Sequence, residues 1–249
     1  MTKQRHWITG RVAAVSGASP GIGAAVTEAI AAAGTQVVLA TRDGSALDDL
    51  AQLISASGGQ ALSVPTDVSK GQEVERLFAA AAQDGHPTAL VCPAGIQTMV
   101  PFAETTCQIW AQTIGINLTG SFLCCRAAIN AMRASAAGRI ISVASSGAYP
   151  TERFPCMAAY VASKQGVVWL TEAIAVEGNE YDISAVCVCP GVVDTQMLRR
   201  SAPDLRPELK PCDVATLILA LLDNPLTMAN GAYIPPFFKS VSRILTVVQ

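Results

Sequence analysis

The sequence is poor in charge, in aromatic residues and in histidine. Charged residues make up 14% of its 249 residues, aromatic residues 5%, and the formal net charge is −2. Because the charges form no basic or acidic block, nothing indicates a nucleic-acid partner or an anionic membrane surface. The two histidines, His6 and His86, lie near the N-terminus and next to a proline. A hydrolase built on a Ser-His-Asp triad is therefore disfavoured.

Long apolar runs are also missing, although 51% of the residues are hydrophobic. A membrane-spanning helix needs about 18 consecutive apolar residues. The nearest candidate, residues 24–34, is interrupted by Thr27 and Glu28. The first residues, MTKQRHWITGR, contain no apolar segment of the signal-peptide kind. We therefore expect a soluble, cytoplasmic protein with no membrane partner.

The eight cysteines form none of the usual metal-binding or redox spacings. No C-x-x-C pair occurs, and most of the cysteines lie in apolar runs such as FLCCRAA (122–128) and AVCVCPG (185–191). Apolar surroundings of this kind are typical of buried, reduced thiols. With so little histidine available as well, we expect neither a metal site nor a disulfide.

Short apolar runs of the strand type alternate with longer helical stretches along the whole chain. Near-continuous apolar runs are typical of parallel strands covered on both faces, and they occur at 11–16, 36–40, 60–64, 88–92, 139–143, 183–189 and 231–234. Helical stretches lie near 21–33, 44–57, 70–84, 105–134, 157–178 and 211–223. The alternation predicts one α/β domain over residues 1–249, doubly wound and Rossmann-type, with a parallel seven-stranded sheet. Ligand-binding loops are expected at the carboxyl edge of this sheet, at 93–104, 144–156 and 190–210.

A glycine-rich turn, SGASPGIG (16–23), joins the first predicted strand to the first helix. Gly17, Gly21 and Gly23 would let the backbone approach a pyrophosphate closely, and the free N–H groups at a helix start attract anions. The spacing of these glycines differs from the common G-x-G-x-x-G fingerprint. Taken alone, the motif is compatible with a dinucleotide site and with a simple connecting loop.

Arg42 follows the second predicted strand, in the segment LATRDG. A carboxylate at this place would bind the ribose 2′-hydroxyl of NAD, whereas an arginine matches a 2′-phosphate in charge and geometry. The sequence therefore favours NADP(H) over NAD(H) as cofactor. A solvated surface arginine is the alternative, and Pro20 in the glycine-rich turn supplies no second positive charge.

Several polar residues of the second half of the chain are candidates for catalysis. Tyr160 and Lys164 lie four residues apart on a predicted helix, which places them on one face. An ammonium close to a phenol lowers the pKa of the phenol toward the working range. Ser145 and Ser146 follow a strand, and Asn117 lies in an apolar helical run. A chance Tyr/Lys pair and a hydrogen-bonded core amide are the structural alternatives.

Seven motifs occur in order along the chain: SGASPGIG, TDVS (66–69), PAG (93–95), INLTGSF (116–122), GRIISVASS (138–146), YVASK (160–164) and CPGVVDT (189–195). This ordered set resembles the classical short-chain dehydrogenase/reductase family, and the 3-oxoacyl reductases within it, over nearly the whole chain. The resemblance implies a catalytic tetrad of Asn117, Ser145, Tyr160 and Lys164. Together with Arg42, the residues expected to contact the cofactor are Gly17, Ser19, Gly21, Ile22, Gly23, Asp67, Val68, Ala94, Gly95, Tyr160, Lys164, Pro190, Gly191, Val193 and Thr195.

The resemblance also implies the reaction, which is reversible hydride transfer between a nicotinamide and a ketone or secondary alcohol. Tyr160 is expected to donate or accept the proton, and Ser145 to hydrogen-bond the substrate oxygen. Lys164 is expected to bind the nicotinamide ribose and lower the pKa of the tyrosine, and Asn117 to position a water. The family further implies a homodimer or homotetramer built on the helices at 105–134 and 157–178. An NAD-dependent secondary alcohol dehydrogenase and a non-catalytic dinucleotide-binding regulatory protein remain the alternatives.

The chain departs from the family pattern in several places. Cys92-Pro93 replaces the usual Asn-Asn before Ala-Gly, so two amide side chains that tie neighbouring strands together are absent. Tyr160 follows Ser145 at a slightly longer interval than usual, which leaves Ser146 as a substitute. Pro235-Pro236 is expected to stop the last strand. Phe237 and Phe238 are expected to form an apolar patch.

The arginines in or near the predicted substrate loops, which could meet an anionic substrate, are Arg153, Arg199 and Arg200.

Overall fold

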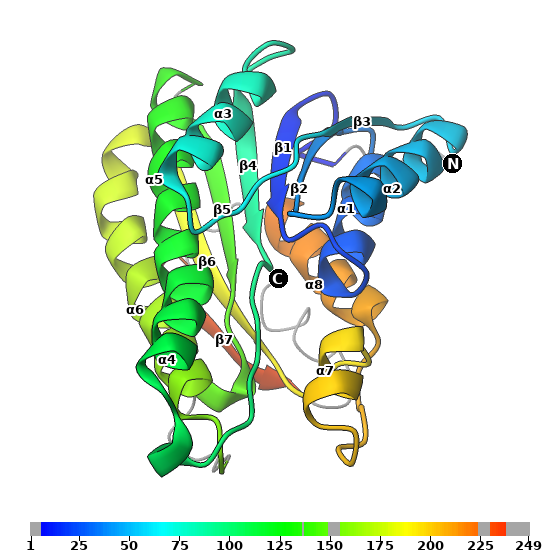
Figure 1. The fold of residues 1–249 in the computed structure, drawn as a ribbon. Coiled ribbons are helices and arrows are strands. Elements are labelled where there is room, and N and C mark those ends of the chain that lie inside the picture. The colour runs from blue at the N-terminus through cyan, green and yellow to red at the C-terminus, as the bar shows by residue number, and fades with distance from the viewer. Residues whose placement is uncertain (1–5, 136, 149–154, 224–229, 238–249) are drawn as a thin grey trace.

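A parallel sheet covered by helices on both faces forms the body of the molecule (Figure 1). The structure is a computed structural model and describes residues 6–135, 137–148, 155–223 and 230–237. The strands are β1 (Val12–Ser16), β2 (Gln36–Ala40), β3 (Gln60–Ser63), β4 (Pro87–Cys92), β5 (Gly138–Val143), β6 (Ile183–Pro190) and β7 (Tyr233–Phe237). Their order is β3-β2-β1-β4-β5-β6-β7, and every neighbouring pair is parallel. The predicted doubly wound, seven-stranded sheet is therefore confirmed.

Helices on the two faces of the sheet bury alternate residues of the same strands. Ala13 and Val15 of β1 pack in the cluster with α1 (Ile22–Ala32), α2 (Gly44–Ala56) and α8 (Pro211–Asp223). Ala14 lies in the opposite cluster, with α3 (Gly71–Ala81), α5 (Gly120–Met132) and α6 (Ala158–Gly178). Figure 1 shows α5 and α6 on one side of the sheet and α1 and α8 on the other. In the described part of the chain, no helix is long and apolar enough to cross a membrane.

The chain order changes direction between β1 and β4, and this position determines where ligands can bind. After β1 the chain adds β2 and β3 on one side of β1. It then crosses back and adds β4, β5, β6 and β7 on the other side. In open α/β sheets such a switch leaves a crevice outside the carboxyl ends of the two strands. The glycine-rich turn follows β1, and residues 93–99 follow β4, so both segments border this crevice.

The predicted helix over 105–134 is interrupted by a π-helical turn. Its parts are α4 (Cys107–Ile114), the π turn η2 (Gly115–Thr119) and α5, and Asn117 lies on the π turn. Single π turns inside longer helices are rare and frequently mark functional sites. Apolar periodicity cannot reveal such a turn, because one extra residue in the helical ladder changes the pattern very little.

A short helix follows β6, within the segment 190–210 that was predicted to be a loop. Helix α7 (Gln196–Ser201) begins after Thr195, whose side-chain oxygen accepts a hydrogen bond from the backbone N of Leu198 at 3.2 Å. This is the usual N-cap arrangement for threonine. The signal was present in the sequence, since a threonine precedes a run of good helix formers.

The prediction that Pro235-Pro236 ends the last strand is wrong. Strand β7 runs from Tyr233 to Phe237 and pairs with β6 alone, with an irregularity in register between Val188 and Pro190. A proline is tolerated in an edge strand, where its missing N–H leaves no ladder bond unmade. The apolar patch expected at Phe237 and Phe238 lies outside what the structure describes, since no side chain there is placed.

Candidate active site

A cavity of about 700 Å³ occupies the crevice at the switch between β1 and β4. Its walls are the glycine-rich turn, the segment after β4 and the first residues of α7. The residues predicted to contact a cofactor that line this cavity are Gly17, Ser19, Gly21, Ile22, Gly23, Arg42, Asp67, Val68, Ala94, Gly95 and Thr195. A cavity of this size is in the range that binds small-molecule cofactors.

The glycines of the turn are required by close backbone contacts. A Cβ at Gly17, where φ is +67°, would lie 2.5 Å from the Cα of Ala94, and one at Gly23 would lie 1.9 Å from the carbonyl oxygen of Gly17. Helix α1 then begins after Gly21 without a side-chain cap and without an acidic residue in its first turn. The helix start therefore presents its positive end to the cavity, which suits a phosphate group.

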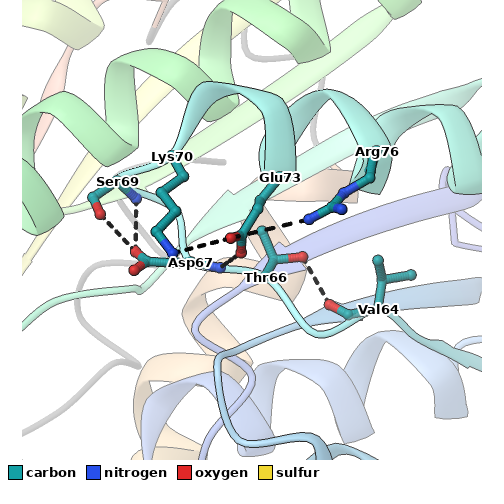
Figure 2. Close-up of polar contacts among 7 residues, drawn as sticks. All are labelled: Val64, Thr66, Asp67, Ser69, Lys70, Glu73 and Arg76. Atoms are coloured by element: carbon teal, nitrogen blue, oxygen red, sulfur yellow. Dashed lines mark hydrogen bonds and ion pairs between the residues drawn. The ribbon is translucent and has the colours of Figure 1, made fainter.

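The TDVS segment is fixed by a network of polar contacts, shown in Figure 2. The Asp67 carboxylate accepts hydrogen bonds from the hydroxyl of Ser69 at 2.7 Å and from its backbone N at 3.1 Å. Glu73, on α3, accepts from the backbone N of Asp67 at 2.7 Å, and Lys70 Nζ lies 3.2 Å from its carboxylate. Thr66 donates to the carbonyl of Val64 at 2.8 Å. These contacts hold Asp67 and its neighbour in place at the cavity wall.

Arg42 lies at the same end of the cavity as Asp67. Burial raises the pKa of the Asp67 carboxyl, but the hydrogen bonds from Ser69 and the charges of Arg42 and Lys70 outweigh it, so the pKa lies below its ordinary value. Asp43, the next residue, accepts a hydrogen bond from the backbone N of Ala46 at 3.2 Å and caps α2. The carboxylates of Asp67 and Asp43, which are near Arg42, thus already accept hydrogen bonds from other groups.

Tyr160, Ser145 and Lys164 come together at the inner end of the crevice. The phenol of Tyr160 faces the hydroxyl of Ser145, and burial raises the pKa of the phenol while Ser145 lowers it. Lys164 Nζ donates to the carbonyl of Val143 at 2.8 Å and lies 5.9 Å from the centre of the Tyr160 ring. Burial lowers the pKa of Lys164 from its ordinary value to about 8. Two serines, Ser145 and Ser146, were candidates for contact with the phenol. In the structure Ser145 is the one that lies next to it.

Asn117 is buried, and its side chain joins three parts of the fold. Its Oδ1 accepts from the backbone N of Ile96 at 2.8 Å, and its Nδ2 donates to the carbonyl of Ile96 at 2.9 Å. Nδ2 also donates to Ser163 Oγ at 3.0 Å. A Cβ at Gly95 would meet Asn117 Oδ1 at 3.3 Å and Lys164 Nζ at 3.4 Å. The π turn is therefore tied to the segment after β4 and to α6, contacts that spacing in the sequence did not reveal.

Cys92 uses its side chain at the end of β4, where the sequence departs from the family. The buried thiol lies beside the thiols of Cys124 and Cys125 on α5 and beside Ser16 at the end of β1, and these neighbours lower its pKa. All eight cysteines of the chain are free, and five of them are buried. No group of three His, Cys, Asp or Glu side chains suited to a metal occurs among the described residues.

A smaller cavity of about 110 Å³ adjoins the phenol. It is bordered by Tyr160, Ser145 and Ser146, by the predicted cofactor contacts Pro190, Gly191 and Val193, and by the apolar side chains of Met157, Val192, Met197, Leu198 and Leu205. Of the three arginines considered for an anionic substrate, Arg153 lies outside the described residues. Arg199 pairs with Asp194 at 2.8 Å, and Arg200 lines the larger cavity.

Comparison with known proteins identifies the family of the chain. The family model described as short chain dehydrogenase matches residues 11–206. An uncharacterized oxidoreductase of Thermotoga maritima is 31% identical over 90% of this chain and 87% of its own length. A D-beta-hydroxybutyrate dehydrogenase of Rhizobium meliloti is 32% identical over 78% of this chain and 76% of its own length. A crystal structure of a short-chain type dehydrogenase/reductase from Mycobacterium marinum, 30% identical, superposes with a TM-score of 0.86 over 92% of this chain and 94% of that one.

The chain belongs to the short chain dehydrogenase family. It is therefore an oxidoreductase that acts on alcohol or ketone groups with a nicotinamide cofactor, NAD(H) or NADP(H).

The glycine contacts predict a steric effect that can be measured. Replacing Gly23→Ala places a methyl group against the carbonyl of Gly17, a backbone atom that cannot move aside. We expect a loss of about 1–3 kcal/mol in the free energy of unfolding, as for other overpacked sites, together with weaker dinucleotide binding. Gly71→Ala is the matched control, because its Cβ would lie 3.7 Å from Leu123 in ordinary contact. Equal denaturant midpoints for the two variants would contradict the steric argument.

Proposed function

We propose that the protein is an NADP(H)-dependent oxidoreductase of the ketoreductase or 3-oxoacyl reductase type, which interconverts a ketone and a secondary alcohol. The observation that carries this proposal is the group formed by Tyr160, Ser145 and Lys164, of which Tyr160 and Ser145 line the smaller cavity. A buried phenol, a hydroxyl facing it and an adjacent ammonium are the parts needed for proton transfer to or from a carbonyl oxygen.

The residues of the larger cavity fit a dinucleotide. Gly17 and Gly23 allow the close backbone packing of the turn, and the start of α1, which no side chain caps, would bind a phosphate. Asp67 and Val68 would contact the adenine, and Tyr160 and Lys164 the ribose of the nicotinamide. Pro190, Gly191, Val193 and Thr195 would hold the nicotinamide itself, with Ser19, Ile22, Ala94 and Gly95 along the path between. When bound, the cofactor supplies or accepts a hydride.

The side chains of Tyr160, Ser145 and Lys164 would carry out the proton transfer. In ketone reduction, the Tyr160 phenol donates its proton to the carbonyl oxygen, and the Ser145 hydroxyl hydrogen-bonds the same oxygen. The ammonium of Lys164 stabilises the phenolate that results. Asn117 holds the segment after β4 through Ile96, next to Lys164, and would keep a water-filled path from the ammonium to solvent in place.

The preference for NADP(H) rests on Arg42. Its guanidinium lines the cavity near Asp67, at the end where the adenosine ribose would lie. A guanidinium binds a 2′-phosphate through paired, charge-assisted hydrogen bonds. Asp67 offsets part of this positive charge but is itself bonded to Ser69, so Arg42 is left to meet the phosphate.

The family resemblance extends to self-association. Helices α4, α5 and α6 expose large apolar side chains, with Trp110 at 44%, Phe122 at 43% and Trp169 at 63% exposure. Exposed apolar groups on neighbouring helices are typical of surfaces that bind another protein. We propose that these helices pack against a second copy of the chain, in a homodimer or homotetramer.

Removal of the phenol hydroxyl tests the proton donor. Tyr160→Phe should lower kcat by about 10²–10⁴-fold, the usual contribution of a positioned acid or base, without loss of the folded state. Tyr181→Phe is the matched control, since this hydroxyl contacts Arg133 at the surface. Initial rates with NADPH and a panel of ketones measure the effect. Undiminished turnover by Tyr160→Phe would rule out the proposed mechanism.

Replacing Arg42 with an acidic residue tests the NADP(H) preference. Arg42→Asp should weaken NADPH binding about tenfold or more, because a charge-assisted contact is lost and a repulsion is introduced. NADH binding should stay equal or tighten. Arg206→Asp, at an exposed position between α7 and α8 that lines neither cavity, controls for the change in net charge. Binding titrations of both nucleotides give the ratio, and an unchanged ratio in Arg42→Asp would refute the assignment.

The lowered pKa of Lys164 predicts a pH dependence. Because burial lowers this pKa to about 8, the ammonium is charged below that pH and loses its proton above it. The pKa of Tyr160 is raised, so the phenol keeps its proton over the same range. We therefore expect kcat/KM for ketone reduction to fall as pH rises through about 8. In Lys164→Arg, whose guanidinium stays charged, the residual activity should show no fall there. A fall at the same pH would assign it to another group.

A further inference from the structure

One face of the short helix α7 forms part of the wall of the larger cavity. Gln196 and Arg200 are four residues apart, as are Met197 and Ser201, and all four line the cavity. Residues at this spacing lie above one another on a helix. Leu198 is buried on the other side, and the guanidinium of Arg199 is bonded to Asp194 at 2.8 and 3.1 Å.

Helix α7 stands directly opposite the glycine-rich turn. A Cβ at Gly21, where φ is +130°, would lie 3.3 Å from Cγ2 of Thr195, the residue that caps α7. Ser19 and Pro20 of the turn line the same cavity as Arg200. The start of α1 and the inner face of α7 are therefore two walls of one part of the cavity.

The charges along the cavity are unevenly placed. Among the described residues that line it, Arg42 and Arg200 are the two with a positive charge. Arg42 belongs to the end with Asp67. Arg200 forms no ion pair with any described residue, in contrast to the neighbouring Arg199. Its exposed guanidinium thus keeps its hydrogen-bonding capacity for a ligand.

We propose that Arg200 binds the bridging diphosphate of the dinucleotide, opposite the N–H groups at the start of α1. This inference rests on the proposed function, because it requires a dinucleotide in the larger cavity. The planar guanidinium offers paired donors to phosphate oxygens. An anionic substrate is the competing ligand, but Arg200 does not line the cavity next to Tyr160, whereas Met197 and Leu198 of the same helix do.

Cofactor fragments separate this role from every other role of Arg200. The probes are 2′-phospho-ADP-ribose, which contains the diphosphate, and adenosine 2′-monophosphate, which lacks it. Arg200→Met should weaken binding of the first about tenfold or more, as expected for loss of a hydrogen bond to a charged group, and leave the second unchanged. Arg199→Met, which removes the neighbouring charge, should change neither affinity by more than about twofold. Arg200→Lys should restore part of the loss.

The outcomes divide clearly. A loss confined to the diphosphate-containing probe, and smaller at high salt because charges are screened, supports the proposal. Equal affinities of wild type and Arg200→Met for both probes overturn it, as does an equal loss for both probes, which would place Arg200 at the adenosine end. A raised KM for the ketone with unchanged probe binding would assign Arg200 to the substrate. Failure of wild type to bind either probe would overturn the proposed function itself.

Discussion

The burial of one positive charge, the ammonium of Lys164, is the constraint on which the rest of the site depends. A buried charge is costly unless hydrogen bonds replace its hydration, and Lys164 is only 4% exposed. The carbonyl of Val143, at the end of β5, supplies one such bond. Gly95 leaves the space beside Nζ open. The same burial lowers the pKa of the ammonium to about 8. Burial therefore both destabilises the charged form and brings the proton equilibrium of Lys164 close to neutral pH.

Two sets of contacts hold the segment after β4 beside this charge, and one of them uses thiols in place of amide side chains. Asn117 fixes Ile96 and Ser163 from the π turn. On the other side of the segment after β4, the Cys92 thiol contacts Ser16 and two thiols of α5. Thiols are weak hydrogen-bonding groups but pack well in apolar surroundings. Strand β4 is thus joined to β1 and α5 in a different way, while Ala94 and Gly95 keep the close approach to Gly17 and Lys164.

The sequence predicted the sheet well because its strands are covered on both faces. The apolar runs had to be near-continuous there, so their positions and their parallel pairing could be inferred. Local chemistry that leaves the apolar pattern unchanged was harder to predict. The π turn at Asn117 and the thiol contacts of Cys92 depend on partners distant in the sequence. The strand through Pro235-Pro236 depends on lying at the edge of the sheet, which only the assembled strand order shows.

The two cavities differ in the charge of the side chains that line them. The larger cavity has arginines and carboxylates along its walls, whereas none of the described residues that line the cavity next to Tyr160 is charged. Under the proposed mechanism, the low effective dielectric constant of such surroundings would strengthen the action of the Ser145 hydroxyl and the nearby ammonium on a developing oxyanion. The described side chains that would meet a ketone there are uncharged and mostly apolar, and in an apolar pocket one methylene group changes the binding free energy by about 1–3 kcal/mol. Under the proposed function, the charges along the larger cavity would select the cofactor, and apolar contact in the smaller cavity would select the substrate.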